Sequence, residues 1–455
     1  MITRLQITDN HEPIALESPC DSRYWHSEID ETVKTDLQKI ANVKIRDLKV
    51  DDNPNLLIFP QNFNQYGDKI SEGCIISLQD DNISTNNIMG FVGVNNTQLD
   101  IKSRFVIKTK NDQNPNKAYV EDYFLHYMLQ KVFSINMFDI KHTSNKEQIF
   151  DFLMYLFPYH LKKALAQGLF KKYRTFEHND ANLRGVIDVS RHIRQNIPFK
   201  GTVAYTTRSH SYDNEITQLI RHTIEFIKTK PSGSVVLNND LETRQCVSQI
   251  VAATPTYKPT LRDKIIGQNL RPVRHPYFSA YTALQNLCIK ILRHESIKFG
   301  NEKDKVYGIL FDGAWLWEEY LATFLKDFTH PRSKTDNIGK KMFCNPHRVL
   351  CQPDFFIDGK IVLDAKYKKH ETLFDKKQRE DRFQLLSYMH IFNASQSGLI
   401  VPSNKTGLLE QGEIVNGGTM SLYGLCVNHD ANNFLDYAKA MKNEETVTVT
   451  TWKFL

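Results

Sequence analysis

The sequence has no long run of apolar residues, and its first residues, MITRLQITDNHEP, contain no apolar stretch. A transmembrane helix needs about 20 mainly apolar residues, and a secretory signal peptide also needs an apolar segment. We therefore expect a cytoplasmic protein with no membrane association. The seven cysteines form no Cys-x-x-Cys pair, which indicates reduced thiols. Cys344, His347 and Cys351 lie close enough in sequence to suggest zinc, but no fourth ligand is evident, so buried thiols are preferred.

A second absence concerns nucleotides. The chain contains no GxxxxGK[ST] phosphate loop, and the stretch NIGKKMF has the Gly-Lys pair without the preceding glycine. We therefore expect this chain to bind no nucleotide, so that any nucleotide chemistry belongs to another chain. The net charge of +6 is only a mild bias toward anionic partners. With 455 residues, 41% hydrophobic and 24% charged, the chain is long enough for two or three ordinary globular domains.

The pattern along the chain predicts an α/β multidomain protein. Residues 1–115 are β-rich, with CIISLQ, IMGFVGV and TQLDIKSRFVIKT between Asn, Asp and Gly clusters. Residues 116–297 are mainly helical, and the polar stretch KNDQNPNK at 110–117 is a plausible boundary. Residues 298–455 alternate helices with strands and predict an αβ core with a mixed sheet, ending in a helix, NNFLDYAKAMKN, and a strand, TVTVTTWKFL.

Positive charge is concentrated in the middle region. From His160 to His210 the chain has ten Lys or Arg against three Asp or Glu, which gives a local charge of +7. Such a segment is either a solvated helix face or a surface for phosphates or an acidic partner, and the sequence leaves both open.

The stretch CQPDFFIDGKIVLDAKYKK, residues 351–369, places three charged residues in apolar, strand-like sequence. Buried charges are costly unless they are paired. Asp358-Gly359 between two apolar runs predicts a hairpin turn. A two-residue loop would put Asp354 and Asp364 on opposite faces, whereas a three-residue loop would pair them directly, so we expect the longer loop or a bulge. Asp364 and Lys366 are two residues apart and therefore share a face.

Two converging carboxylates suit Mg²⁺ or Mn²⁺, because hard cations prefer oxygen ligands together with waters and phosphate oxygens. A bound metal ion lowers the pKa of its water and supplies a nucleophile, and a neighbouring lysine stabilises charge that develops on a phosphate. This combination points to phosphodiester hydrolysis.

Two flanking helices offer further candidates. In the predicted helix FDGAWLWEEYLATFLKDF, Glu318 flanks the apolar stripe while Glu319 points away from it, so Glu318 is the better candidate. In KQREDRFQLLSYMHIFNA, Gln384 and Tyr388 are four residues apart and share one helix face. Taken alone, Gln384 and Tyr388 are more ordinary as packing or surface residues, and a solvated helix glutamate is the alternative for Glu318.

In this order, the residues resemble the PD-(D/E)xK nuclease superfamily. The helix glutamate would be Glu318, followed by Pro353-Asp354 and by Asp364-Ala365-Lys366. Gln384 and Tyr388 resemble the QxxxY motif of the RecB-like branch. The resemblance implies that Asp354, Asp364, the Ala365 backbone carbonyl and Glu318 bind the metal. It also implies that Lys366 is the catalytic lysine, and that Gln384 and Tyr388 orient it or bind phosphate.

A narrower resemblance is to McrC, the nuclease subunit of modification-dependent restriction systems. GILFDGAWLWEEYLATFL, QPDFFIDGKIVLDAKYK and RFQLLSYMHIF are similar to its C-terminal half. FVGVNNTQLDIKSRF and the segment around Arg184 and Gly185 are similar to its upstream parts, so the likeness covers most of residues 90–400. The LlaJI-type systems have a similar subunit, and the sequence does not separate the two. The resemblance implies DNA as substrate and a partner, an McrB-like AAA+ ring, a hexamer that hydrolyses GTP.

Three functions follow as hypotheses. The first is a Mg²⁺-dependent DNA endonuclease subunit that docks on the ring and stimulates GTP hydrolysis. The second is a stand-alone RecB-like DNA exonuclease, which the Gln384 and Tyr388 pair permits. The third is a non-catalytic activator of a ring NTPase, against which the intact set of Asp354, Asp364 and Lys366 argues.

Overall fold

A computed structural model describes most of the chain, and the chain forms two compact units. The first unit comprises Met1–Asp139 and Gly300–Leu455, and the second comprises Ile140–Phe299. The described residues are 3–20, 23–48, 56–60, 72–106, 122–133, 145–230, 233–238, 240–293, 306–331, 338–344, 349–369, 372–415, 417–431 and 433–452. The expected boundary stretch at 110–117 and His347 therefore lie outside the described residues.

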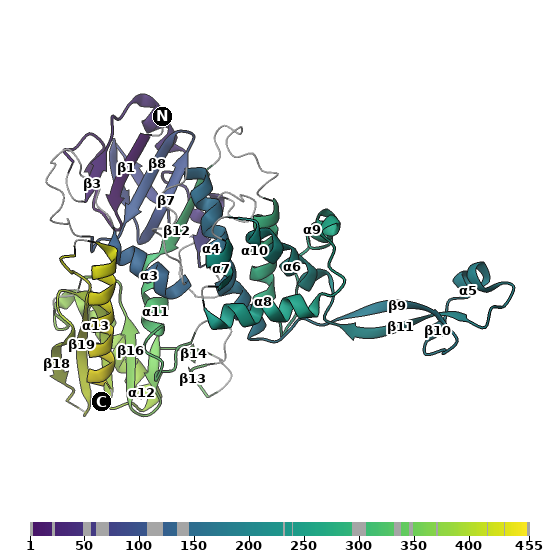
Figure 1. Cartoon of the computed structure of the whole chain (residues 1–455). Coiled ribbons are helices and arrows are strands. Elements are labelled where there is room, and N and C mark those ends of the chain that lie inside the picture. Colours follow the sequence, from purple (N-terminus) through teal and green to yellow (C-terminus); the bar gives the residue numbers. More distant parts are fainter. Residues whose placement is uncertain are drawn as a thin grey trace. The chain divides into compact units, whose positions relative to one another are not determined.

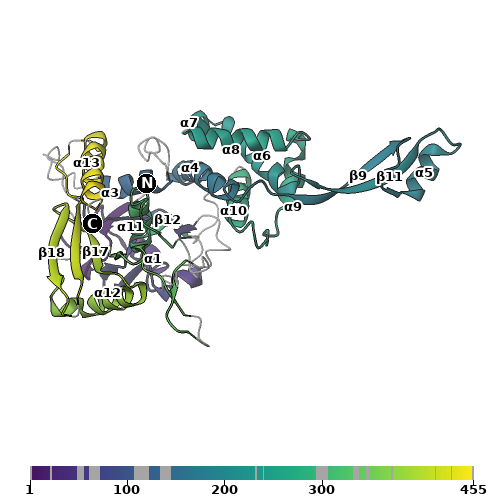
Figure 2. The same ribbon diagram turned by 90° about the horizontal axis from the view of Figure 1, so that it is seen from below.

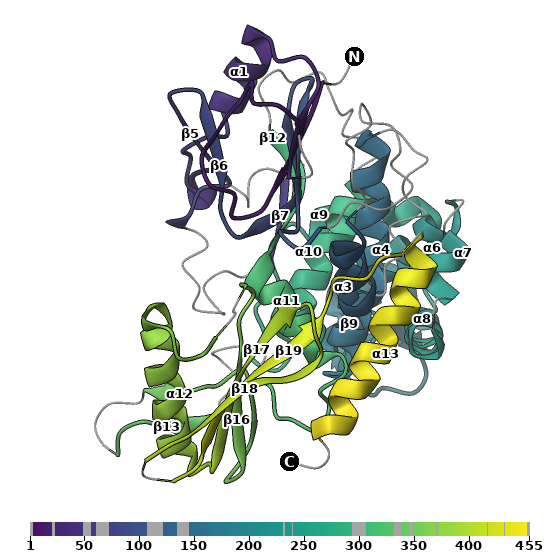
Figure 3. The same ribbon diagram turned by 90° about the vertical axis from the view of Figure 1, so that its left-hand side faces the viewer.

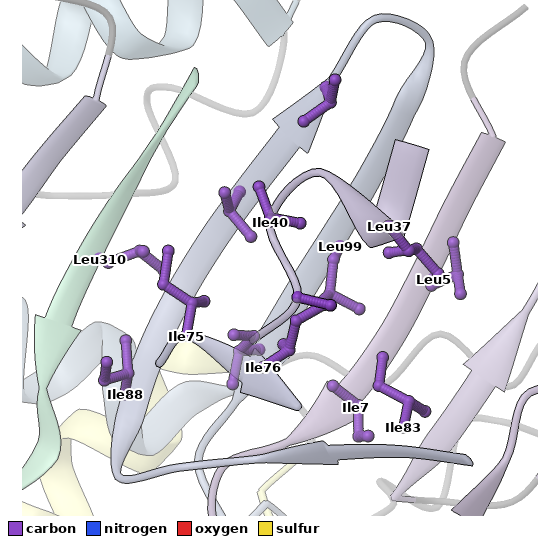
Figure 4. Close-up of a cluster of buried hydrophobic side chains, with 14 of the residues drawn as sticks. Leu5, Ile7, Leu37, Ile40, Ile75, Ile76, Ile83, Ile88, Leu99 and Leu310 are labelled. Atoms are coloured by element: carbon purple, nitrogen blue, oxygen red, sulfur yellow. The ribbon is translucent and has the colours of Figure 1, made fainter. Parts of the chain in front are cut away.

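The N-terminal part of the first unit is built on a mixed sheet (Figure 1). Its strand order is β3 (Tyr24–His26), β1 (Thr3–Thr8), β8 (Thr97–Lys102), β7 (Ile88–Val94), β12 (Val306–Asp312) and β4 (Leu56–Phe59). A smaller sheet, β2 (Ile14–Ala15), β6 (Asn82–Thr85) and β5 (Ile76–Gln79), lies with helix α1 (Glu31–Gln38) and the 3₁₀ helix Ile45–Leu48 around the same core. Figure 4 shows this core, in which Leu5, Ile7, Leu37, Ile83 and Leu99 are fully or almost fully buried. The strands expected in CIISLQ, IMGFVGV and TQLDIK are confirmed.

Strand β12 joins the N-terminal sheet although it follows the whole second unit in sequence. It pairs with β7 in antiparallel and with β4 in parallel orientation. Its first residue, Val306, falls inside the segment 298–455 that the sequence grouped as one domain. The second unit is therefore an insertion between α3 (Tyr123–Phe133) and β12. The domain boundaries expected near residues 115 and 297 stay predictions.

The C-terminal part of the first unit is a second mixed sheet with helices on both faces (Figure 3). The strand order is β15 (Phe355–Ile357), β16 (Ile361–Ala365), β17 (Gln396–Ser403), β19 (Thr419–Cys426) and β18 (Gly407–Glu413). Strands β16, β17 and β19 run parallel, while β15 and β18 are antiparallel to their neighbours. Helix α12 (Arg379–Phe392), which follows a short 3₁₀ turn (Lys376–Gln378), covers one face, and α13 (Phe434–Trp452) covers the other. The expected mixed sheet is thus present.

Three further elements complete the first unit. Helix α11 (Gly313–Ala322) follows β12 directly, because the Asp312 carboxylate accepts a hydrogen bond from Trp315 N at 2.8 Å and caps the helix. A short ribbon of β13 (Lys340–Lys341) and β14 (Leu350–Cys351) precedes β15. Cys351 packs in a buried cluster with Phe356 and Phe392, and burial raises the pKa of its thiol to about 11. The expectation of a buried thiol is confirmed for Cys351 and is wrong for Cys344, which is exposed.

The hairpin that carries the acidic residues has the longer of the two loops considered. Ile357 pairs with Ile361, so Asp358, Gly359 and Lys360 form a three-residue loop. Gly359 has φ +71°, which favours glycine at this position. The prediction of this loop is confirmed, and the register of Phe355 with Leu363 brings Asp354 opposite Asp364.

The C-terminal segment differs from the expectation. TVTVTT was expected to be a strand, but it continues helix α13 to Trp452. Met441, Glu445 and Thr448 are buried at helical spacing. The Glu445 carboxylate accepts hydrogen bonds from Tyr127 of α3 at 2.8 Å and from Tyr320 of α11 at 3.0 Å. These tertiary contacts outweigh the β propensity of the Thr and Val residues.

The second unit is a group of helices with a projecting arm. The helices are α4 (Asn145–Leu165), α6 (Glu215–Lys228), α7 (Gly233–Asn238), α8 (Leu241–Ala253), α9 (Arg262–Gln268), preceded by a 3₁₀ turn (Pro259–Leu261), and α10 (Ala280–Arg293). The helix start expected at NEITQL is confirmed, since Asn214 and Thr217 form a reciprocal capping box. Within the described ranges, neither unit has a helix that is long and apolar enough to cross a bilayer.

The arm consists of β9 (Lys172–Asp180), β10 (Val186–Ile187), α5 (Val189–Asn196) and β11 (Val203–Ser211). Strands β9 and β11 pair from Lys172 with Ser211 to Asp180 with Val203, and the ribbon extends away from the helices of its own unit (Figures 1 and 2). The arm interrupts the region 116–297 that was expected to be mainly helical, because α4 ends at Leu165 and Gly168 takes φ +94° before β9 begins.

A buried histidine gives the second unit a pH dependence. His160 on α4 is buried, and burial together with nearby Lys163 lowers its pKa from 6.5 to about 3. The unfolded chain therefore binds a proton below pH 6.5 that the folded unit does not accept. We expect the stability of this unit to fall by about 1.4 kcal/mol per pH unit as the pH drops from about 6 to about 4.

In a His160→Leu variant, the stability of the second unit should no longer fall between about pH 6 and about pH 4 through this histidine. A His210→Leu variant, changed at an exposed histidine, should keep the pH dependence of the wild type. All tryptophans lie in the first unit, so opening free energies from hydrogen exchange in α4 are the suitable measurement. Equal pH dependence in the wild type and in His160→Leu would contradict the assignment.

Candidate active site

The two acidic residues lie at the same level of the β15–β16 hairpin. Directly opposite residues of an antiparallel pair project to one face. The Asp354 Oδ2 atom accepts a hydrogen bond from Ala365 N at 2.7 Å, which ties the end of one strand to the other. The Asp354 carbonyl is 2.6 Å from Nδ1 of His330, whose ring stacks on Phe355. The backbone therefore holds Asp354 from both sides.

Asp364 is the buried centre of the site. Its side chain is 3% exposed, and its Oδ2 lies 2.6 Å from Lys366 Nζ. Its Oδ1 accepts a hydrogen bond from Gln384 Nε2 at 3.2 Å. Burial raises the pKa of Asp364, while the Lys366 ammonium opposes this shift. Among the described residues, Oδ2 has no hydrogen-bond donor in good geometry, so its only compensation is the ion-pair contact.

Lys366 is held on the same face of the sheet as Asp364. Its backbone N–H donates to the Ile400 carbonyl at 2.9 Å, which continues the β16–β17 pairing past Ala365. Its Nζ donates to Gln384 Oε1 at 3.2 Å. Burial by itself lowers the pKa of Lys366, but Asp364 and the more distant Asp354 outweigh it and raise the pKa. Lys366 is therefore a fixed cation at neutral pH and is not a base.

Gln384 connects the site to helix α12. Its amide oxygen accepts from Lys366, and its amide nitrogen donates to Asp364 and, at 2.8 Å, to the hydroxyl of Tyr388. Burial and the Asp364 carboxylate raise the pKa of Tyr388, so its hydroxyl keeps its proton. The shared helix face expected for Gln384 and Tyr388 is present, and it faces the two charged residues of β16.

The structure places Glu318 less directly. Helix α11 packs against β16, and Trp317 Nε1 donates at 3.3 Å to the Ile400 carbonyl, which also accepts from Lys366 N. Glu318 and its neighbour Glu319 are both half-buried. Their exposure therefore does not single out Glu318 as the better candidate. The roles of Glu318 and of the Ala365 carbonyl as metal ligands stay predictions.

Two charged residues at the site were not anticipated from the sequence. Asp381 of α12 is buried, lies 2.7 Å from Lys368 Nζ and is 3.9 Å from Lys366 Nζ. It stands three residues before Gln384, on the same helix face, and Lys368 stands two residues after Lys366. These spacings are the features of the sequence that could have identified Asp381 and Lys368 as site residues. Asp381 thus adds a third carboxylate, and Lys368 a second, more exposed cation.

Tyr367 connects the site with the N-terminal sheet. Its buried hydroxyl is 2.8 Å from Ser103 Oγ and donates to Met89 Sδ at 3.2 Å. The Arg104 guanidinium lies over its ring at 4.9 Å and is paired with buried Asp9. Because Tyr367 directly follows Lys366, this network fixes the backbone of the catalytic strand from the opposite side. No local sequence pattern links residues so far apart.

The donor set fits a hard divalent cation. Carboxylates from Asp354 and Asp364 converge, and the buried Asp364 Oδ2 has no hydrogen-bond donor among the described residues. Such an oxygen is the atom that a metal ion would compensate. Carboxylate oxygens of this kind favour Mg²⁺ or Mn²⁺ over softer metals.

A family model described as "McrBC 5-methylcytosine restriction system component" matches residues 83–402 of this chain. The chain belongs to this family. The matched range contains every residue of the candidate site, from Glu318 to Tyr388, as well as the arm.

Comparison with solved structures gives two McrBC assemblies from Thermococcus gammatolerans. The first is a refined half-complex from a tetradecameric assembly of McrB AAA+ hexamers with bound McrC, at 16% identity and a TM-score of 0.43, covering 97% of this chain and 100% of that chain. The second is a cryo-EM structure of the McrBC complex, at 15% identity and a TM-score of 0.31, covering 71% and 87%. A comparison with curated proteins gives no match. Membership of the McrBC family rests on the sequence match.

Gln384 should act by positioning, because it bridges both charges of β16. We expect Gln384→Ala to lower any hydrolytic activity by about 10- to 100-fold without loss of folding. The same variant should raise the metal concentration for half-maximal activity, because Asp364 loses its amide donor. Ser387→Ala, at an exposed position of the same helix, is the matched control. A drop in rate with unchanged metal dependence would argue that Gln384 contacts substrate and does not position Asp364.

Proposed function

We propose that this chain is a metal-dependent deoxyribonuclease subunit of an McrBC-type restriction system. The observation that carries the proposal is the group formed by Asp354, Asp364 and Lys366, with Gln384 bonded to both charges of β16. Family membership supports the biological setting. Modification of the DNA as a requirement for cleavage, and a cytoplasmic location, are parts of the same proposal.

Each side chain of the site would have its own role in phosphodiester hydrolysis. Asp354 and Asp364 would hold Mg²⁺ or Mn²⁺, with Glu318 and the Ala365 carbonyl as further ligands. When bound, the metal ion supplies Lewis-acid stabilisation and a water of lowered pKa. Lys366, kept protonated by the carboxylates beside it, supplies positive charge where negative charge develops on the phosphate. Gln384 and Tyr388 hold the lysine in place.

Lys368 is suited to bind the DNA backbone. Its side chain is 42% exposed, and its ammonium group is anchored at 2.7 Å by Asp381. An anchored cation loses less conformational freedom on binding phosphate than a free one does. Lys368 would therefore contact a phosphate next to the scissile one, while Lys366 serves the reaction itself.

The partner in the proposal is an McrB-like AAA+ hexamer that hydrolyses GTP. Two observations support a partner. The sequence has no phosphate loop of its own, so nucleotide hydrolysis would fall to another chain. The arm of the second unit also exposes large apolar side chains that nothing in the described chain covers: Val186, Val189, Ile193, Ile197 and Phe199, each at least half exposed.

The arm is built to keep its shape while exposing this surface. Asp188 caps α5 by accepting from Arg191 N at 3.0 Å, and the Arg191 side chain donates to the carbonyl of Tyr205 at 2.6 Å. Asn196 donates to Asn179 Oδ1 at 2.8 Å and so closes the tip against β9. An apolar, pre-organised surface with basic flanks is typical of a protein-binding element. We assign ring contact to the arm.

The cleavage test uses methylated and unmethylated plasmid DNA with Mg²⁺. We expect cleavage only when the full chain is combined with its ring partner and GTP. Lys366→Ala and Asp354→Ala should each reduce the cleavage rate by at least about 100-fold, because each removes charge that acts in the transition state. Both variants should still stimulate GTP hydrolysis by the partner, since the partner surface is elsewhere. Lys360→Ala, in the exposed hairpin loop, is the control.

The same assay separates the alternatives. Degradation by the chain alone of the same plasmid after linearisation, which supplies DNA ends, would favour the RecB-like exonuclease. Stimulated GTP hydrolysis without cleavage under any condition would favour the non-catalytic activator. Cleavage that survives Asp354→Ala would contradict the site assignment itself.

The arm is tested by reducing its apolar surface. We expect Val189→Ser combined with Phe199→Ser to abolish stimulation of GTP hydrolysis, because each side chain is more than 60% exposed and would lose apolar contact only with a partner. Leu270→Ser, exposed in the same unit outside the arm, should have no effect. Normal stimulation by the double variant, together with weakened DNA binding, would reassign the arm to DNA.

A further inference from the structure

A cluster of potential metal ligands lies at the C-terminal end of β19, outside the candidate active site. Cys426 is the last residue of that strand, His429 follows in the next loop, and Glu444 comes from α13. One ligand atom from each side chain lies within 4.8 Å of the other two. A thiol, an imidazole and a carboxylate are the three ligand types of protein zinc sites, and Cys-x-x-His is a short spacing suited to one ion.

The backbone around Cys426 is fixed independently of any ion. Cys426 N donates to Thr406 Oγ1 at 2.8 Å, and Val427 N donates to the Ser403 carbonyl at 3.0 Å. The hydroxyl of Tyr437, on α13, donates to the Val427 carbonyl at 2.7 Å. Strand, loop and helix are thus held together at the level of the cluster, which gives the ligands a pre-organised frame.

The ring of His429 makes a hydrogen bond that fixes which of its nitrogens carries the proton. Its Nε2 lies 3.2 Å from the Cys426 carbonyl. A carbonyl only accepts, so Nε2 carries the proton and Nδ1 keeps the lone pair that a metal ion needs. A backbone carbonyl bonded to the outer nitrogen of a histidine is the usual arrangement behind a metal ligand. The ring of Tyr437 packs edge-on against the same imidazole at 5.7 Å.

Glu444 is the least explained member of the cluster without an ion. It is half-buried, and its carboxylate makes no hydrogen bond or ion pair with any described residue. One of its carboxylate oxygens lies within 4.8 Å of the Cys426 thiol and of a His429 ring nitrogen, so a cation between them would give it a partner. The neighbouring Asn428 Oδ1 is also buried without a donor among the described residues, so a polar acceptor stands beside the cluster.

We propose that Cys426, His429 and Glu444 bind one Zn²⁺ ion and that this ion ties α13 to the edge of the C-terminal sheet. Zinc ligands stand roughly 3.3–3.6 Å apart in a tetrahedral site, so a small rotation of the flexible Glu444 side chain completes the geometry. Water fills the fourth position. The site is separate from the proposed Mg²⁺ site, which contains no thiol, and it does not depend on the proposed nuclease activity.

The test is a Co²⁺ titration of the full chain after removal of metals with a chelator. We expect sulfur-to-cobalt charge-transfer absorption that saturates at a single equivalent and is displaced by Zn²⁺. Cys426→Ser should abolish this absorption, and His429→Gln and Glu444→Gln should weaken Co²⁺ binding at least tenfold. Cys20→Ser, at an exposed cysteine, and Asp364→Asn, in the other candidate site, should leave the absorption unchanged.

A second measurement needs no variant. Thiol labelling of the wild-type chain, followed by mass spectrometry, should show Cys426 protected when Zn²⁺ is present and labelled when it is removed, while Cys20 is labelled in both. The proposal is overturned if Co²⁺ gives no thiolate absorption, if the absorption survives Cys426→Ser, or if Zn²⁺ leaves the labelling rate of Cys426 unchanged.

Discussion

The candidate active site depends on one buried carboxylate, Asp364, beside one lysine, Lys366. Asp364 is almost fully buried, and an unpaired carboxylate there would be protonated or would destabilise the sheet. Burial raises the pKa of Asp364, and Lys366 opposes this rise through a 2.6 Å contact, while Asp364 in return raises the pKa of Lys366. Gln384 then satisfies one atom of each. The ion pair costs desolvation energy, so packing alone does not account for its presence in the sheet. Binding of a metal ion and a phosphate, as proposed above, would account for it.

Local sequence patterns predicted those parts of the site that depend on residues close together in the sequence. Asp358-Gly359 predicted the turn, alternation placed Asp364 and Lys366 on one face, and helical spacing joined Gln384 to Tyr388. Each of these rules spans a few residues. The longer loop or a bulge was expected because it brings Asp354 opposite Asp364, and the structure shows the three-residue loop.

The features that the sequence did not reveal depend on tertiary contacts. The Thr- and Val-rich end of the chain is helical, because Glu445 meets the hydroxyls of Tyr127 and Tyr320. Strand β12 pairs with β7 and β4, partners far away in the sequence, so no local boundary signal identifies the sheet to which it belongs. Tyr367 reaches Ser103 for the same reason. Sequence patterns describe elements, whereas the choice of partner for each element is a property of the whole fold.

Because the second unit is an insertion, one chain could carry the proposed active site in the first unit and the proposed partner surface in the second. Both of its ends return to the first unit, so its helices and arm can change without altering the pairing of β12 with β7. The active site depends on a buried network, from Asp9 and Arg104 through Tyr367 to Lys366, in which small shifts are costly. The arm carries its exposed side chains on a ribbon whose stability comes from its own hydrogen bonds. The candidate active site and the exposed surface of the arm are therefore stabilised by separate sets of interactions. Substitutions in the arm are expected to leave the candidate active site intact, and the reverse.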